Sequence, residues 1–293
     1  MQNREKFVKE ESSISSELQV NTNEIISGGP PKDGIPSIDE PKFIEVSEAT
    51  FLNNNSPGIL VQFEEDVRFY PFAILVWHEI VNDVVGGKTL AITYCPLCES
   101  SIVFEREING KIYDFGTSGK LYQSNLVMYD RQTGSLWSQV LGGSILGPLQ
   151  GTYLQIYPSS FLTFSDVQDL YPEAKVLSTG TGYQRDYSRN PYGTYAISED
   201  IYFPVENSDG RLPAKELIYA FSIEGEFKAY SYKNLIKKKE LKDRVAGHNV
   251  VITVSDAKEI IVHDQTENKR VYGFTSFWFA WVTHHPDAEV WIE

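Results

Sequence analysis

The only two cysteines of the chain, Cys95 and Cys98, lie three positions apart in the segment Tyr94-Cys-Pro-Leu-Cys98. They follow the apolar run 89–94, which is typical of a β-strand, so both thiols are expected where that strand ends. His78 lies upstream in a helix-like segment, 73–83. Two thiols and an imidazole can form a metal centre, and two thiols alone can form a redox pair.

The first hypothesis is a site for one transition-metal ion. Two sulfurs at the end of a strand can reach one ion at about 2.3 Å, and His78 as third ligand leaves a position open for water or substrate. Thiolates with an imidazole suit copper or zinc, and affinity favours copper. A copper ion would make the protein an oxidoreductase, whereas zinc would suggest hydrolysis or a structural role. Since the short turn Gly86-Gly87 links the His78 segment to the strand, we expect the imidazole within about 5 Å of a cysteine sulfur.

Two alternatives stay open at this stage. Cys-Pro-Leu-Cys resembles the glutaredoxin type of redox motif, in which a helix N-terminus lowers the pKa of the first thiol. Here an apolar strand precedes the cysteines and a second run, 101–104, follows them, so the βαβ context of that motif is missing. The other alternative is a non-catalytic binding or structural module with buried, inert thiols.

Composition restricts the partners. The chain has 293 residues, 41% of them hydrophobic, and a formal net charge of −14. That charge argues against nucleic acid and anionic membranes, which need clustered Lys and Arg. No apolar stretch approaches the roughly 20 residues of a membrane span. We expect a small-molecule substrate and a cytoplasmic protein as the sequence stands, or an exported one if a leader was removed; the oligomeric state is open.

A repeat predicts the fold. Tyr70 aligns with Tyr230 and Gly87 with Gly247, a constant shift of 160 residues. We therefore expect a mainly β (α+β) fold, built from two duplicated β-rich half-units with a few short helices. The first half is 59–177 and the second, degenerate half is 214–293. His78, Cys95 and Cys98 face Lys238, Ser255 and Lys258 (or Ala257), so the site is expected in the first half.

Three further segments complete the expected organisation. Residues 1–24 read as a disordered leader, because they show no sustained apolar period. Residues 25–58 form a Pro/Gly-rich clasp loop, in which Lys32 and Asp33 could border the cleft. Residues 178–213 form a crossing loop, in which Tyr192 and Tyr195 could line a cleft between the halves.

The first half also carries an insertion, 119–160, with a hairpin that turns at 132–135. Asp130, Arg131 and Trp137 flank this turn and are the candidate catalytic residues. Arg131 suits the orientation of an anionic substrate, and Trp137 suits an apolar wall of the cysteine cavity. The alternative is an Asp130–Arg131 pair that only rigidifies the hairpin.

Several long strings point to a family. They are GGPPKDGIPS, WHEIVND, TYCPLCESSIVF, SGKLYQSNLVMYDRQTGSLW, PYGTY and FWFAW. With them the chain, from about Ile25 to its C-terminus, closely resembles the family known as domain of unknown function 3179. The resemblance implies a family and no activity. Members of that family often carry an export or lipid-anchor signal, so the resemblance weighs against the cytoplasmic expectation.

Overall fold

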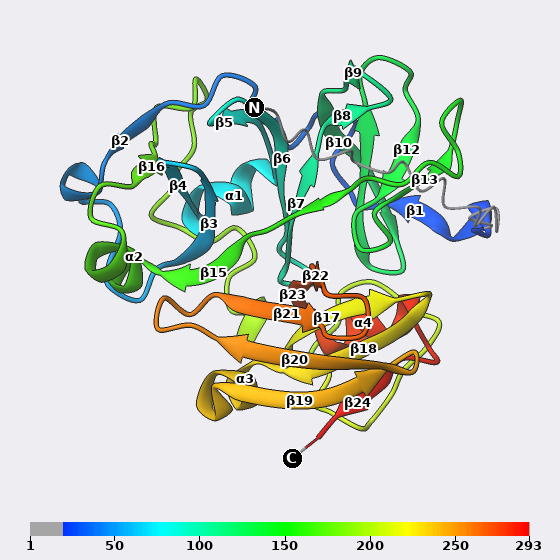
Figure 1. Cartoon of the computed structure of the whole chain (residues 1–293). Helices are drawn as coiled ribbons and strands as arrows, with labels where there is room; N and C mark the ends of the chain where they lie inside the picture. The colour runs from blue at the N-terminus through cyan, green and yellow to red at the C-terminus, as the bar shows by residue number, and fades with distance from the viewer. Residues whose placement is uncertain (1–19, 293) are drawn as a thin grey trace, which may run out of the picture.

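The computed structural model describes residues 20–292, which are mostly β-structure with four short α-helices. The expectation of a mainly β fold with a few short helices is confirmed. Figure 1 shows the second half of the chain, in yellow to red, packed below the first half, in blue to green. The helices are α1 (Phe72–His78), α2 (Phe164–Leu170), α3 (Tyr232–Lys238) and α4 (Trp278–His284).

One sheet of the first half has five strands. Strands β15 and β3 are antiparallel, β16 runs parallel to β4, and β2 forms the edge. In spatial order the strands are β15 (Ser160–Thr163), β3 (Pro57–Phe63), β4 (Asp66–Pro71), β16 (Lys175–Leu177) and β2 (Phe43–Glu45).

An eight-stranded sheet joins the two halves. Its strand β6 lies between β5 and β7 and is buried over its last six residues, so it reads as a continuous apolar run. The halves meet where β23 pairs with β7, at Thr275 and Ser101, whose hydroxyls are 2.8 Å apart. The strands in order are β24 (Glu289–Trp291), β18 (Glu226–Ser231), β17 (Leu217–Ile223), β23 (Phe274–Phe277), β7 (Ser100–Glu105), β6 (Lys88–Cys95) and β5 (Ile80–Val85), with β14 (Ile156–Tyr157) beside β7.

The insertion and the second half each add a sheet. Strand β1 of the clasp loop pairs with β10, and β10 pairs in turn with β11 of the insertion. The insertion sheet consists, in order, of β1 (Ile25–Ser27), β10 (Phe115–Tyr122), β11 (Asn125–Asp130), β12 (Leu136–Ser138) and β13 (Gly143–Leu146). The sheet of the second half consists of β19 (Glu240–Val245), β20 (His248–Val254), β21 (Ile260–Asp264) and β22 (Lys269–Val271). A separate two-stranded ribbon is formed by β8 (Glu107–Ile108) and β9 (Lys111–Ile112).

The two halves follow the same element order. The order β15-β3-β4-β16 recurs as β23-β17-β18-β24, and β5-β6-β7 recurs as β19-β20-β21. Helices α1 and α3 each end before a residue with positive φ, Glu79 at 59° and Lys239 at 65°. This is the order that the duplication requires; the superposition of the halves stays a prediction.

An ionic network centred on an aspartate also occurs in each half. Asp83 accepts hydrogen bonds from Tyr70 Oη at 2.6 Å and from Arg68 Nη1 at 2.7 Å. In the second half, Asp243 accepts one from Tyr230 Oη at 2.9 Å and pairs with a Lys228 ammonium at 2.9 Å. Each network connects the second strand of a half to the strand after its helix, and so fixes how the two sheets of that half are packed.

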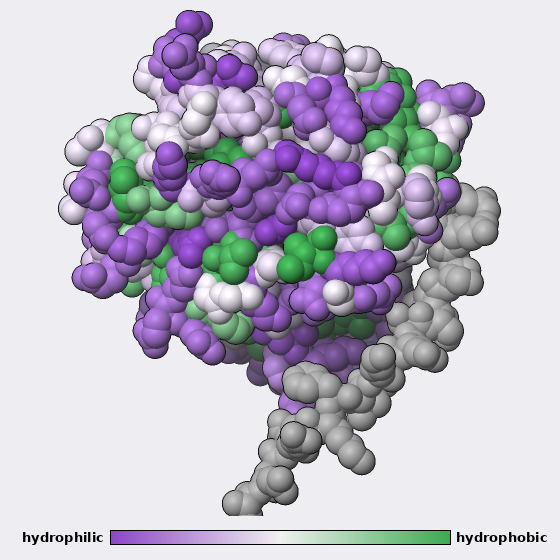
Figure 2. Space-filling model, turned by 90° about the horizontal axis from the view of Figure 1, so that it is seen from above, coloured by the Kyte–Doolittle hydropathy of each residue, from purple (hydrophilic) through white to green (hydrophobic). Residues whose placement is uncertain are grey.

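The outer surface and the N-terminal segment need only brief description. Figure 2 shows mostly hydrophilic side chains on the upper face, with apolar ones in small separate areas. Within residues 20–292, no helix combines the length and the apolar character that crossing a bilayer requires. The predicted disordered leader lies largely outside the described residues, but Thr22–Glu24 already form a 3-10 turn, so order begins earlier than expected.

Candidate functional site

The two cysteines lie in the turn between the central strands β6 and β7. Cys95 pairs with Ser100 across the strands, and the Cys98 N–H donates to the Cys95 carbonyl oxygen at 3.1 Å. The Phe277 N–H donates to the Cys98 carbonyl oxygen at 2.7 Å, and Tyr195 Oη donates to Leu97 O at 3.0 Å. The second half and the crossing loop thus hold the turn in one geometry.

Both cysteines are free and buried. Cys95 is 2% exposed and Cys98 is fully buried, and no disulfide joins them. The Cys98 thiol lies within hydrogen-bonding reach of the Cys95 sulfur, and the Ser124 carbonyl oxygen is a second acceptor for it at 3.2 Å. The two sulfurs therefore lie close together, and the Cys98 thiol has a carbonyl oxygen as a hydrogen-bond acceptor.

The surroundings of the two thiols shift their pKa values in opposite directions. Burial tends to raise the pKa of Cys95, but hydrogen bonds from the Cys98 thiol and from the backbone N–H groups of Leu126, Cys98 and Leu97 together lower that pKa below its usual value. Burial, together with the neighbouring Cys95, raises the pKa of Cys98 well above its usual value. Of the two thiols, Cys95 is therefore the one whose thiolate form is favoured.

Glu79 is a buried acid beside this pair. It follows α1 directly, is 7% exposed, and accepts a hydrogen bond from Tyr192 Oη at 3.4 Å. Its position is fixed by the backbone: its N–H donates to Leu75 O and its carbonyl oxygen accepts from the Tyr94 N–H at 2.8 Å. Burial, and secondarily the Cys95 thiolate, raises the pKa of Glu79 to about 8. A carboxyl with that pKa can hold or release a proton near neutral pH.

A small cavity of about 60 Å³ reaches Cys95 and Glu79. Its walls come from the clasp loop, the insertion and the crossing loop, and they are mainly apolar: Pro30, Ile35, Leu97, Leu121, Leu126 and Phe203. The sequence left two alternatives for the clasp loop, a structural role or a border of the cleft formed by Lys32 and Asp33. The structure binds them to one tyrosine, because Lys32 Nζ lies 3.7 Å from the Tyr129 ring centroid and Asp33 accepts from Tyr129 Oη at 2.6 Å.

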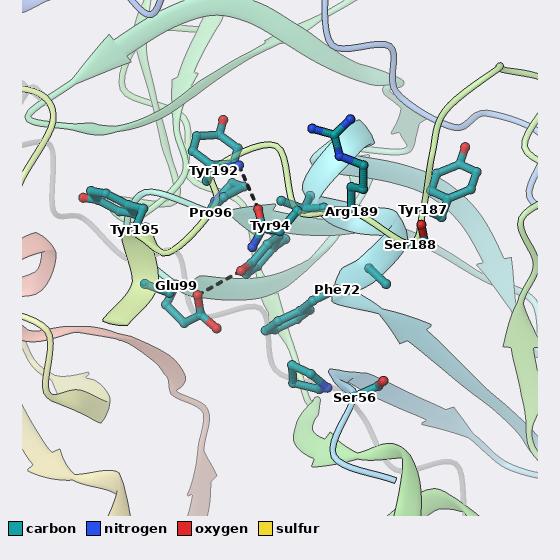
Figure 3. Close-up of a pocket in the computed structure, with 15 residues that line it drawn as sticks. Ser56, Phe72, Tyr94, Pro96, Glu99, Tyr187, Ser188, Arg189, Tyr192 and Tyr195 are labelled. Carbon is teal, nitrogen blue, oxygen red and sulfur yellow. Dashed lines mark hydrogen bonds between the residues drawn. The ribbon is translucent and has the colours of Figure 1, made fainter. Parts of the chain in front are cut away.

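A larger cavity of about 320 Å³ lies on the other side of the same turn (Figure 3). Tyr94, Pro96 and Glu99 line it, together with Tyr192 and Tyr195 from the crossing loop. Tyr192 also lines the small cavity and so forms part of the wall between them. Burial raises the pKa of Glu99 to about 7, against a hydrogen bond from Tyr94 that lowers it.

His78 does not take the predicted place beside the cysteines. Its Nδ1 lies 2.7 Å from Pro36 O, and its Nε2 lies 2.7 Å from Tyr187 Oη. A carbonyl can only accept, so Nδ1 donates to it and Nε2 accepts from the tyrosine. Burial lowers the pKa of His78, which favours this neutral ring. Within residues 20–292, no group of three or more His, Cys, Asp or Glu side chains is arranged to hold a metal ion. The predicted three-ligand site with His78 is not assembled in this structure.

The three hairpin residues also lie apart from the cysteine cavities. Asp130 is fully buried and accepts from Trp137 Nε1 at 3.0 Å and from the Thr133 N–H at 2.6 Å, so it fixes the turn. Trp137 is fully buried and lines neither cavity beside the turn. Arg131 pairs with Asp39 at 2.7 Å and donates to Ser37. The expectation that Arg131 and Trp137 close the cysteine cavity is wrong, because both side chains are used to hold the hairpin and the clasp.

Sequence reasoning missed the two acids that flank the turn. The self-comparison held a signal for Glu79, because its counterpart at the constant shift of 160 residues is Lys239. Glu99 is likewise replaced by Lys258, one position out of that shift. Both acids have positive φ, 59° for Glu79 and 48° for Glu99, a strained conformation that often marks functional positions.

Comparison with known proteins gives a family and no activity. A family model described as "Protein of unknown function (DUF3179)" matches residues 32–288. No curated protein and no solved structure was found to match the chain.

Proposed function

We propose that this chain, which belongs to the DUF3179 family of proteins of unknown function, is a thiol redox protein that cycles Cys95 and Cys98 between a dithiol and a disulfide. The observation that carries the proposal is the geometry of the turn. The two sulfurs lie within hydrogen-bonding reach of each other in one buried turn, and the small cavity reaches Cys95.

The reaction with a small disulfide would proceed in two exchanges. The Cys95 thiolate attacks one sulfur of the substrate; the substrate S–S bond breaks, a mixed disulfide forms and the first substrate thiolate leaves. Cys98 then loses its proton and attacks the Cys95 sulfur, which forms the internal disulfide and releases the second substrate thiolate. Two electrons pass from the cysteine pair to the substrate. We assign Glu79 to take up the Cys98 proton, because its charge influences both sulfurs.

Metal binding is the second candidate. With His78 held by Pro36 and Tyr187, the donors that remain together are the sulfurs of Cys95 and Cys98. Two soft thiolates suit monovalent copper better than zinc, which takes four ligands in structural sites. One copper ion per chain at this pair stays a prediction, and the redox couple is preferred because it needs no further ligand.

The test is a redox titration of the native protein. The protein is equilibrated in dithiothreitol and glutathione buffers of graded potential, quenched in acid, unfolded, alkylated and weighed intact. We expect one two-electron transition from two alkylated thiols to none. Cys98→Ser should trap a mixed disulfide at Cys95, whereas Cys95→Ser should trap none. The proposal fails if both cysteines of the folded protein stay reduced at every potential. Elemental analysis of chelator-free protein then decides the second candidate.

A further inference from the structure

The larger cavity beside the turn has one acid and several aromatic walls. Figure 3 shows the Glu99 carboxylate against the Tyr94 hydroxyl, with the other rings arranged around them. At about 320 Å³ the cavity is in the size range of small-molecule sites. The rings that line it are those of Phe72, Tyr94, Tyr187, Tyr192 and Tyr195.

The Glu99 carboxylate is only half satisfied. Tyr94 Oη donates to its Oε2 at 2.9 Å, and within residues 20–292 its Oε1 makes no hydrogen bond or ion pair. Glu99 is only partly buried, so this second carboxylate oxygen is open to a ligand or to water. The backbone of Glu99 is also in the left-handed region, at φ 48°, which is uncommon for a residue other than glycine.

In the second half, the position equivalent to Glu99 is occupied by Lys258. Lys258 has the same left-handed backbone, at φ 56°, and its ammonium pairs with Asp166 at 2.6 Å. The position therefore carries a charge in both halves, but only in the second half does a side chain of the opposite charge neutralise it. In the first half the charge faces a cavity.

We propose that this cavity binds a small organic ammonium ion, with Glu99 as the counter-ion and tyrosine rings as its walls. Aromatic faces attract cations, and a carboxylate beside them adds a charged hydrogen bond. Arg189 is the cationic residue of the lining, and Figure 3 places its guanidinium across the cavity from the Glu99 carboxylate. The Lys215 ammonium already lies 3.4 Å from the Tyr195 ring centroid. The bound ammonium ion is therefore expected to contact the rings of Tyr192 and Tyr94 instead.

The test compares two ammonium ions with a neutral alcohol that has the shape of one of them, phenethylamine, on the wild-type protein. Tetramethylammonium, phenethylamine and 2-phenylethanol are titrated by calorimetry at pH 8. We expect at least one ammonium probe to bind at least tenfold more tightly than the neutral alcohol. Binding of the alcohol as tightly as phenethylamine, or no binding of either ammonium probe at 5 mM, overturns the proposal. The thiol chemistry is not involved, so this result is independent of the redox titration.

Substitutions then locate the site. Glu99→Gln should weaken binding of the ammonium probe at least tenfold, with circular dichroism unchanged. The matched control is Glu64→Gln, because Glu64 is also an acid in a left-handed conformation (φ 52°) but is exposed in the turn between β3 and β4. Equal loss in both variants, or no loss in Glu99→Gln, would place the binding elsewhere and refute the assignment.

Discussion

Replacing Glu79 by glutamine should stabilise the protein, and more so at higher pH. The pKa of Glu79 is 4.5 in an unfolded chain and about 8 in the folded protein. Below pH 4.5 both states hold the proton. As the pH rises from there to about 8, the unfolded chain releases the proton while the folded protein keeps it, so ionisation favours unfolding. At about 1.4 kcal/mol per pKa unit, this costs the wild type about 3 to 4 kcal/mol between pH 5 and pH 8. Glutamine has no proton to lose, and it escapes this cost.

The assay is urea unfolding of both proteins at pH 5, 6, 7 and 8 in the presence of a reductant. The expected result is a difference in unfolding free energy, variant minus wild type, that grows by about 3 kcal/mol across this range. Glu240→Gln, at an exposed carboxylate one residue beyond Lys239, controls for the general loss of a negative charge. A difference that stays constant from pH 5 to pH 8 would show that Glu79 is not a buried acid of raised pKa. It would also remove the group that we assign as proton acceptor.

Two more predictions concern residues of the first half. Iodoacetamide should modify Cys95 before Cys98, because the pKa of Cys95 is lowered and that of Cys98 is raised. Peptide mapping after brief alkylation would contradict this if Cys98 reacted first. Arg131→Ala should lower the free energy of unfolding by no more than about 1 kcal/mol, because the Arg131 side chain is 38% exposed. Asp130→Ala should lower it by about 3 kcal/mol, because it leaves buried hydrogen-bond donors unpaired. Calorimetry that ranks the two losses the other way would contradict the structural role of Asp130.

The β-rich fold could be predicted because the relevant signals are local or repeated. Strand β6 reads as an apolar run since it is buried on both faces, whereas the duplication inferred from the 160-residue shift stays a prediction. The cysteine turn was equally visible, because both thiols follow directly on a strand. These features depend on period and spacing, which a sequence states directly.

The surroundings of the cysteines could not be predicted, because distant segments make them. The sequence placed His78 close to Cys95 along the chain, but its ring nitrogens are bound by Pro36 from the clasp loop and Tyr187 from the crossing loop. Trp137 looked like a cavity wall, yet its N–H is satisfied by a buried carboxylate seven residues away. Tertiary packing determines which polar partner each of these side chains binds. Only Tyr192, named as a possible cleft residue, lies in both cavities.

The paired ionic networks allow a prediction that compares the halves directly. Asp83 is 6% exposed and receives a two-pronged hydrogen bond from Arg68 Nη1 together with the Tyr70 hydroxyl, whereas the Asp243 side chain is 20% exposed. Removing the charge from a buried, fully bonded carboxylate is costlier than removing it from a partly solvated one. We therefore expect Asp83→Asn to lower the unfolding free energy by about 3 kcal/mol and Asp243→Asn by about 1 kcal/mol, measured by urea unfolding at pH 7. Equal losses would mean that burial does not set the difference. A larger loss for Asp243→Asn would show that the second half, which lacks the cysteines, depends more on its network than the half that carries the site.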